Sequence, residues 1–460
     1  MEKRHEWSNT LTYVLTTAGA TIGFGATWRF PYLVGENGGG AYVATFIVAM
    51  IVIGIPMILV ENVIGRRAHK NSVDAFDPAY QRKSFSKAWK ILGYMGLVGC
   101  FGIIAYYMVL GGWVLTYITN IISGALNLSS NITAEVTHSF YEANIEHNPL
   151  MIGIYTLAFV ILNYIVLVRG LGDGIEKAMK FLMPMLILCL LAVVIRNITL
   201  PGAGTGISYY LIPDFSKITP KLFIAVLGQV FFALSLGFGV MITLSSYLDK
   251  GENLIKTACF TGVINTLIAL MAGFMIFPSL FSFGLAPESG PKLVFEVLPI
   301  VFSHMHFGGV IAVAFFALLL IAAFTTSVTL YEVLITAAQE KLNLSRRFST
   351  FIVLTFTFIA GNIPSIMAYG PWRDVRIIGK NIFDAFDFIS GNIFFVLTAL
   401  GTAIFVGWVL GDSAKEELSN GAGEKSKGII NIWFNYVKYI VPVVILVVFV
   451  SGILQALGIV

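Results

Sequence analysis

The sequence predicts an all-α integral membrane protein in which eleven transmembrane helices form a 5+5 inverted repeat followed by one additional helix. Three observations predict this fold class. Hydrophobic residues make up 57% of the 460 residues and charged residues only 12%, with a mean hydropathy of +0.84, unlike soluble domains. The apolar residues gather in stretches of about 20, the length that crosses a bilayer. Two of these stretches carry the same glycine motif at their middle, one in each half of the chain.

The expected spans follow one another with short polar segments between them. They cover residues 9–34, 41–65, 88–122, 149–168, 178–198, 221–248, 256–283, 307–338, 348–368, 382–410 and 430–458. We expect residues 1–460 to form a single domain, with the first repeat over 9–198, the second over 221–410 and the additional helix over 430–458. Because each repeat has an odd number of spans, the two copies must cross the membrane in opposite directions.

The basic residues of the connecting segments predict the orientation. With the N-terminus in the cytoplasm, the cytoplasmic segments hold 21 of the 29 Lys and Arg residues, and the opposite segments hold seven. Lys and Arg gather on the cytoplasmic side of membrane proteins, which predicts this orientation in the inner (plasma) membrane of the cell. The net charge of +4 follows from this topology and does not indicate nucleic-acid binding.

The repeated glycine motif interrupts the first and the sixth span. It reads Ile22-Gly-Phe-Gly25 in the first and Leu236-Gly-Phe-Gly239 in the sixth. Non-helical backbone in mid-membrane is tolerated only where it is packed in protein or lines a cavity. Matching breaks in two inverted repeats are typical of secondary transporters, which bind substrate and ions there. The alternative is that the glycines only allow close helix packing, but their equal placement in both repeats favours the breaks.

An unwound segment has chemical uses that a continuous helix lacks. It leaves free N–H groups at the start of one half-helix and free C=O groups at the end of the other, and the helix dipoles add partial charges of matching sign. Such a segment can hold a carboxylate and a small cation side by side. Nucleotide binding is not predicted, because no strand precedes the glycines and no P-loop lysine follows them.

Five motifs, in chain order, resemble the neurotransmitter:sodium symporter family, and within it the eleven-span prokaryotic branch with the LeuT fold. They are GFGATWRFPYLVGENGGGAY, GIPMILVENVIGR, AYYMVLGGW, GQVFFALSLGFG and FTTSVTLYE. The resemblance runs through spans 1 to 10 and is specific, because several motifs match at once. It implies a transporter of amino acids or amines that binds its substrate between helices 1, 3, 6 and 8.

The resemblance implies a substrate site at the two breaks. The residues implied are Phe24, Gly25 and Tyr107 for a carboxylate, Thr21, Phe232 and Ser235 for an amine, and Ile103, Phe232, Phe238, Thr326 and Leu330 for a side chain. Amine-specific relatives carry an aspartate where this chain has Gly23, so the resemblance favours a substrate that brings its own carboxylate. For each apolar residue alone, the alternative is an ordinary place in the helix core.

The family's two sodium sites match this chain unequally. The second is matched by the carbonyls of Gly19, Ile22 and Ala322 and the hydroxyls of Thr325 and Thr326, an all-oxygen set suited to a hard cation. At the first site, Ala26 stands where the family has an asparagine, and Ala233 stands where it has a helix 6 hydroxyl. Thr21 replaces the usual alanine of helix 1, and Asn265 alone remains from the family's side-chain ligands. We therefore expect one sodium ion, at the second site. No chloride is expected, because Ala269 stands where chloride-dependent relatives have a serine and chloride-independent relatives a carboxylate.

Charged residues in or beside spans are costly and usually paired, and the resemblance implies roles for several of them. Arg29 and Asp387 would form the outer gate, Arg4, Trp7, Glu340 and Tyr247 the cytoplasmic latch, and Glu61 a brace for the broken helix 6. Three alternatives remain open. The Arg29–Asp387 pair could be purely structural, Glu340 could be a solvated charge at a helix end, and Glu61 or Glu332 could accept a proton, because burial raises a carboxyl pKa.

The sequence thus predicts sodium-coupled uptake of a hydrophobic or aromatic amino acid by alternating access. One alternative is a sodium-independent or proton-linked transporter of a related aromatic amine or organic-acid metabolite, which the altered first site supports. Another is a ligand sensor that does not transport. An enzyme is not expected, because the spans contain no His/Glu metal set, no Ser/Lys dyad and no paired aspartates. The expected partners are a small-molecule substrate and the lipid bilayer, and oligomeric state is left open.

Overall fold

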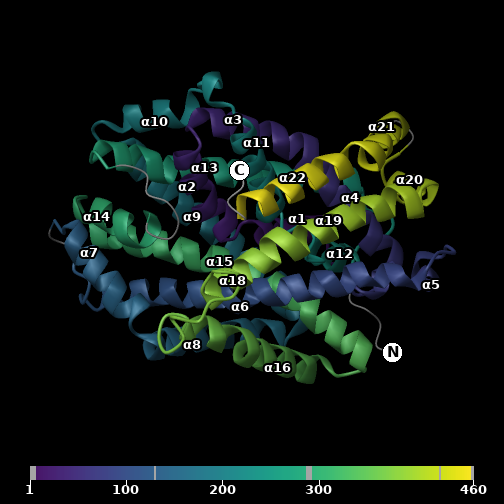
Figure 1. The fold of residues 1–460 in the computed structure, drawn as a ribbon, viewed down its shortest axis with the longest axis horizontal. Coiled ribbons are helices and arrows are strands. Elements are labelled where there is room, and N and C mark those ends of the chain that lie inside the picture. Colours follow the sequence, from purple (N-terminus) through teal and green to yellow (C-terminus); the bar gives the residue numbers. More distant parts are fainter. Residues whose placement is uncertain (1–6, 129–130, 286–292, 424–425, 457–460) are drawn as a thin grey trace.

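The structure, a computed structural model, describes residues 7–128, 131–285, 293–423 and 426–456. Over these residues the protein is built from helices, and they contain no β-strand. The long helices run mainly along the longest dimension of the molecule (Figure 1). The short connecting helices α7 (Ala134–Tyr141), α10 (Ala203–Leu211) and α14 (Leu298–Ser303) lie at one end, and α5 (Pro78–Gln81) and α20 (Asp412–Ser419) lie at the other.

Nine helical segments of the described residues are long and apolar enough to cross a membrane. They contain α3 (Gly40–Ala49) with α4 (Ile55–Ala68), α6 (Lys90–Ile122), α8 (Pro149–Leu167), α9 (Lys177–Ile198), α13 (Leu254–Ser282), α15 (Gly308–Leu342), α16 (Arg346–Thr357) with α17 (Ile363–Met367), α18 (Ile382–Phe388) with α19 (Phe395–Ile404), and α21 (Lys427–Tyr439) with α22 (Val441–Ala456). Each coincides with a predicted span to within several residues. The two remaining predicted spans are divided, and the count of eleven stays a prediction.

The first predicted span is broken at its glycines. α1 (Thr10–Thr21) ends before them, and helical backbone resumes at η1 (Gly25–Arg29), a π-helical turn that continues into α2 (Phe30–Glu36). At Gly23 a side chain would collide with the hydroxyls of Tyr107 and Thr326. This glycine therefore lets the unwound segment approach α6 and α15 directly.

The sixth span is broken at the corresponding place. α11 (Pro220–Ala233) and α12 (Val240–Ser245) are separated by six residues, among which Gly237 and Gly239 have φ values of +84° and +78°. Glycine adopts such values without the steric cost that a Cβ brings. The Glu61 carboxylate of α4 accepts a hydrogen bond from the Gly237 N–H at 2.6 Å, and its role as a brace for this break stays a prediction.

The helices around the breaks form the centre of the bundle. α1 packs against α15 on one side and α13 on another, and α15 also packs against α6. Outer helices instead turn large apolar side chains outward, including Leu188 of α9 (66% exposed), Phe351 of α16 (55%) and Val443 of α22 (60%). Such outward apolar surface suits contact with lipid, while the polar breaks are enclosed by protein.

Candidate functional site

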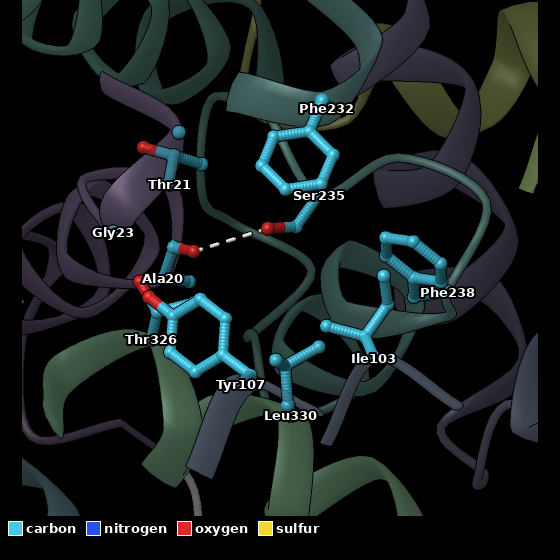
Figure 2. A pocket seen from close by; sticks show the side chains of 11 residues that line it. Ala20, Thr21, Gly23, Ile103, Tyr107, Phe232, Ser235, Phe238, Thr326 and Leu330 are labelled. Carbon is cyan, nitrogen blue, oxygen red and sulfur yellow. Dashed lines mark hydrogen bonds between the residues drawn. The ribbon is translucent and has the colours of Figure 1, made fainter. Parts of the chain in front are cut away.

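A cavity of about 20 Å³ lies between the two breaks. It is lined by Ala20, Thr21, Gly23, Gly25, Ile103, Tyr107, Phe232, Ser235, Phe238, Thr326 and Leu330 (Figure 2). These residues include all those predicted for the substrate except Phe24, which contributes a backbone amide nearby. The prediction did not include Ala20 or Gly23 as contacts, because their exposure to the cavity depends on how closely α6 and α15 approach the break.

The amide end of the first break faces the Tyr107 hydroxyl. The Phe24 N–H donates a hydrogen bond to Tyr107 Oη at 3.2 Å, and the two rings lie 5.0 Å apart between centroids. At Gly25 a Cβ would lie 2.9 Å from the Phe232 ring, so glycine allows that ring to cover the amide. Helix N-terminal amides and a hydroxyl donor together favour an anionic group.

The carbonyl end of the break faces the sixth span. Ser235 Oγ donates a hydrogen bond to the Ala20 carbonyl oxygen at 3.1 Å, drawn as the dashed line in Figure 2. Ser235 has a φ of +50°, a left-handed backbone conformation within the sixth-span break. Carbonyl oxygens at a helix C-terminus carry partial negative charge, so this end can accept hydrogen bonds from an ammonium group.

Apolar side chains form the remaining walls. Ile103 of α6 and Leu330 of α15 lie on one side of the cavity, and Phe238 belongs to the break of the sixth span (Figure 2). Phe232 also contacts Arg29, whose guanidinium carbon lies 4.4 Å from the ring centroid. The side-chain region of the cavity is therefore apolar. The Phe232 ring that covers it also contacts the Arg29 guanidinium.

The residues predicted for the second sodium site lie where α1 meets α15. Thr326 Oγ1 donates to the Gly19 carbonyl at 3.1 Å, and Thr325 Oγ1 donates to the Ala322 carbonyl at 3.1 Å. Ile22, at the end of α1, is fully buried. A hydroxyl that donates one hydrogen bond keeps lone pairs for a cation. The donor set here is buried and contains oxygen atoms alone, which fits a hard cation.

The residues predicted for the first sodium site are arranged differently. Ala26 and Ala233 are buried and supply no side-chain oxygen, and the Thr21 hydroxyl donates back to the Ala18 carbonyl at 2.8 Å. Asn265 of α13 directs its Nδ2 amide toward the Thr21 carbonyl at 2.9 Å. The side chains that face this position are therefore apolar or act as donors, which does not fit a dehydrated cation.

The predicted outer gate has no direct ion pair in this conformation. Among the described ion pairs within 4.0 Å, none joins Arg29 to Asp387. Asp387 of α18 is exposed, although it lies near enough to influence Arg29 electrostatically. Arg29 instead contacts the Phe232 ring and the Tyr32 side chain. The gate assignment thus stays a prediction, with the cation held on the aromatic ring that covers the cavity.

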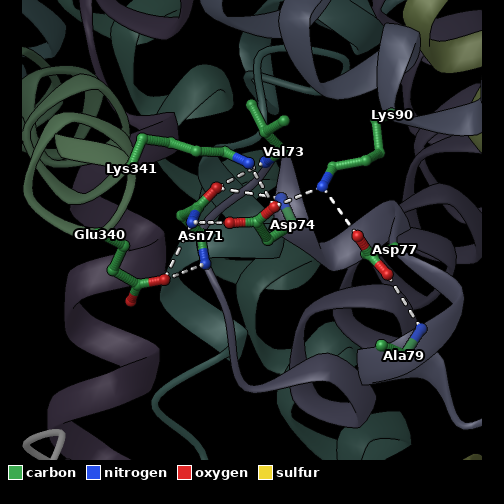
Figure 3. Close-up of polar contacts among 8 residues, drawn as sticks. All are labelled: Asn71, Val73, Asp74, Asp77, Ala79, Lys90, Glu340 and Lys341. Carbon is green, nitrogen blue, oxygen red and sulfur yellow. Dashed lines mark hydrogen bonds and ion pairs between the residues drawn. The ribbon is translucent and has the colours of Figure 1, made fainter. Parts of the chain in front are cut away.

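The predicted cytoplasmic latch is built around Trp7. Its Nε1 donates to the Leu244 carbonyl at 2.9 Å, and its ring lies 6.3 Å from that of Tyr247. Tyr247 in turn donates to Glu332 at 3.0 Å. Glu340 accepts hydrogen bonds from the backbone and side-chain amides of Asn71 at 3.1 and 2.9 Å (Figure 3). Arg4, the fourth latch residue, lies outside the described residues.

Several polar contacts near the site were not predicted from the sequence. Gln229 Nε2 donates to the Gly25 carbonyl at 2.6 Å, which fixes the first turn of η1. The Glu176 carboxylate accepts hydrogen bonds from the N–H and hydroxyl of Ser8 at 2.9 and 2.7 Å, next to Trp7. Glu332 forms an ion pair with Arg346 at 2.6 Å. The first two contacts join residues 204 and 168 positions apart, and the third joins α15 to α16 across the turn between them, so no local pattern revealed them.

Comparison with known proteins identifies the relatives of this chain. The model of the sodium:neurotransmitter symporter family matches residues 4–151 and 148–458. A sodium-dependent transporter of Haemophilus influenzae is 62% identical over 453 residues, which cover 98% of both chains. The sodium-dependent transporter YhdH of Bacillus subtilis is 35% identical over 451 residues, again 98% of both. A crystal structure of MhsT in complex with L-phenylalanine superposes with a TM-score of 0.87 at 36% identity, over 98% of this chain and 100% of that one.

These matches confirm the predicted family resemblance and the LeuT-type helical fold. They also confirm that the protein is a transporter and not an enzyme, and they support sodium as its coupling ion. With its apolar spanning helices, the protein is a multi-pass membrane protein. The chain belongs to the sodium:neurotransmitter symporter family.

Proposed function

We propose that this chain takes up a hydrophobic or aromatic amino acid together with one sodium ion by alternating access. The observation that carries the proposal is the meeting of three surfaces in one cavity, namely an amide end, a carbonyl end and an apolar wall. An amino acid offers the three matching groups, a carboxylate, an ammonium and a side chain. The likeness to MhsT, whose crystal structure contains L-phenylalanine, supports an aromatic side chain.

The cavity must enlarge to admit such a substrate. Its volume of about 20 Å³ suits little more than one water molecule. Phe232 is the residue whose movement would provide room, because its ring lines the cavity and covers Gly25. The same movement would release Arg29 from its cation–π contact. Opening of the cavity and freeing of the outer-gate cation are therefore one event, after which Arg29 can reach Asp387.

The sodium ion would join α1 to α15. Its proposed ligands are the carbonyls of Gly19, Ile22 and Ala322 and the hydroxyls of Thr325 and Thr326. An ion shifts a conformational equilibrium only through different affinities for the two states, and this ligand set is complete only while the two helices stay in contact. Because Thr326 also lines the substrate cavity, ion and substrate stabilise the same arrangement of α1 and α15.

The direction of transport follows from the proposed orientation. With Trp7 and Glu340 on the cytoplasmic side and Asp387 on the outside, 21 of 29 basic residues face the cytoplasm, as the positive-inside rule favours. Contacts of Trp7 with Leu244 and Tyr247 then close the inner side of the bundle. We place the protein in the inner membrane, where an inward sodium gradient would drive uptake.

Ligand binding to the purified protein tests this function. Thermal stability is measured against a panel of amino acids and aromatic metabolites, in sodium and in potassium at equal ionic strength. We expect stabilisation by a hydrophobic or aromatic amino acid in sodium alone, with a Hill coefficient near one for sodium. Uptake into proteoliposomes under a sodium gradient then separates a transporter from a sensor. A ligand that stabilises the protein equally in both salts would contradict sodium coupling.

A further inference from the structure

The Asn265 amide lies between the ends of the two broken helices. Asn265 belongs to α13 and is fully buried. Its Nδ2 donates hydrogen bonds to the carbonyls of Thr21 at 2.9 Å and Ala233 at 3.3 Å. These are the last helical residues of α1 and α11. One side-chain amide thus satisfies the terminal carbonyls of both half-helices.

Two helix C-termini that meet inside a protein need compensation. Their final carbonyls have no intrahelical partner, and each terminus carries about half a negative charge from its dipole. Either a cation or a hydrogen-bond donor can balance them. The neighbouring Ala26 and Ala233 side chains are apolar, and the Thr21 hydroxyl is directed back to Ala18. Ser235 and Thr326 donate to the earlier carbonyls of Ala20 and Gly19, and the Asn265 amide balances the last carbonyl of each half-helix.

We propose that the Asn265 amide nitrogen replaces a cation between these two helix ends, so that the chain carries its substrate with a single ion. This inference deepens the proposed function and rests on its sodium coupling. Asn265 Oδ1 is buried and has no hydrogen-bond partner in the described part of the chain. A turn of the amide would place this oxygen against two carbonyl oxygens, an arrangement that only an intervening cation could stabilise. Amide donation and cation binding are therefore mutually exclusive here.

The number of available oxygens decides between the two arrangements. Without substrate, a cation at this position would meet only the carbonyls of Thr21 and Ala233 and the oxygen of Asn265, too few to replace its hydration shell. An incompletely compensated buried charge is strongly unfavourable. The neutral amide needs two acceptors for its nitrogen, and it has both.

Asn362 provides a matched control within the same protein. It is also fully buried, its Nδ2 also donates to two carbonyls, those of Ile104 and Ala105 at 2.9 Å each, and its Oδ1 also lacks a partner among the described residues. Its two acceptors, however, are consecutive residues inside the continuous helix α6. The Asn362 amide therefore caps no helix end, and its replacement tests burial and charge without the convergent carbonyls.

The test compares Asn265→Asp with Asn362→Asp and the unaltered protein. Sodium binding is followed by thermal stability in sodium against potassium, first without substrate and then with the amino acid found above. The pH is held at about 9.5, above the value of roughly 8–9 to which burial can raise a carboxyl pKa, so that the introduced carboxyl is ionised. We expect the sodium Hill coefficient to rise from near one to near two in Asn265→Asp, because the new carboxylate and the two carbonyls require a cation. Asn362→Asp should keep a coefficient near one.

Two results would overturn the inference. A folded Asn265→Asp protein with a coefficient still near one would show that the amide does not hold a cation's place. A coefficient near two in the unaltered protein would show that a second ion binds with the amide present, and this result decides the question even if the variant does not fold. If the unaltered protein ignores sodium, the proposed function fails, whereas sodium-dependent stabilisation gained by Asn265→Asp would still support the inference.

Discussion

The unwound end of α1 meets α15 on one side and α13 on the other, and these two helices present different groups to its carbonyl oxygens. α15 presents the hydroxyl of Thr326 to the Gly19 carbonyl at 3.1 Å, and a hydroxyl retains lone pairs for a cation. α13 presents the Asn265 amide nitrogen to the Thr21 carbonyl at 2.9 Å, and an amide nitrogen is a donor alone. A broken helix thus offers similar oxygens in two directions, and the facing side chain determines whether an ion can join them.

The largest expected effect is on the α15 side. Thr325→Ala or Thr326→Ala removes a buried hydroxyl from the proposed sodium ligands. The ion then loses one coordinating oxygen, and alanine offers no other oxygen in its place. We expect sodium affinity to fall by about tenfold or more, since losing a partner of a buried charge costs roughly 1.5–3 kcal/mol. Sodium titration of substrate-induced thermal stabilisation measures this.

Thr329→Ala is the matched control for those variants. Thr329 is a buried threonine of the same helix, and its hydroxyl donates to the Thr326 carbonyl at 2.8 Å, away from the α1 carbonyls. It should lower stability without changing the sodium dependence. Unaltered sodium dependence in both Thr325→Ala and Thr326→Ala would remove the basis for placing the ion between α1 and α15.

The next effect concerns the carboxylate of the proposed substrate, which we place between the two sides. Tyr107→Phe removes the hydroxyl that faces the Phe24 amide at 3.2 Å. A hydrogen bond to a charged group contributes roughly 1.5–3 kcal/mol, so we expect affinity for a carboxylate substrate to fall by about 10- to 100-fold. Tyr106→Phe is the control, because it removes a neighbouring buried hydroxyl of the same helix that does not line the cavity. Equal affinities in both variants would indicate a substrate without a carboxylate.

A smaller effect on sodium binding should appear when side-chain oxygens like those of the α15 side are added near α13. Ala26→Asn combined with Ala233→Thr adds side-chain oxygens near the two helix ends. With these present, the Asn265 amide can turn its oxygen inward, and we expect the sodium Hill coefficient to move from near one toward two, with weak affinity for the added ion. Each single substitution supplies one oxygen and serves as the control. A coefficient of one in the double variant would show that the amide cannot turn within its packed surroundings.

The sequence predicted the parts of this site that depend on local pattern. The repeated glycines located both breaks, because positive φ values at Gly237 and Gly239 and the close approach at Gly23 each require a residue without a side chain. The family motifs brought nine of the ten proposed substrate residues to one cavity. The first sodium site was expected to be altered, since Ala26 and Ala233 carry no polar atom.

The parts that were not predicted depend on side-chain orientation and long-range contact. A sequence names Asn265 without indicating whether its oxygen or its nitrogen faces the helix ends. Arg29 was expected to pair with Asp387, and its place on the Phe232 ring follows from the conformation of the gate. The contact of Glu176 with Ser8 joins residues 168 positions apart. Tertiary packing alone determines these three features.

The smallest expected effect concerns Asp74, which should not titrate between pH 5 and 8. Asp74 lies in the connection between α4 and α6, outside the spanning segments, where it contacts Lys341, Lys90 and Asn71 (Figure 3). Partial burial acts to raise its pKa, but hydrogen bonds from these three residues outweigh burial and lower the pKa from 3.8 to about 2. Because the folded-state pKa is depressed, the stabilisation is complete above about pH 4 and is lost as the pH falls toward 2.

This cluster should therefore contribute nothing to pH dependence between pH 5 and 8. Asp74→Asn should lower the thermal midpoint of unfolding by about 2 °C, and this difference should be the same at every pH from 5 to 8. Substrate binding by the variant should keep the pH profile of the unaltered protein. If the unaltered protein binds substrate equally well from pH 5 to 8 in sodium, binding does not require a proton. The proposed sodium site between α1 and α15 is then sufficient for coupling. A midpoint difference that changes between pH 5 and 8 would mean that Asp74 titrates there, contrary to its contacts with two lysines.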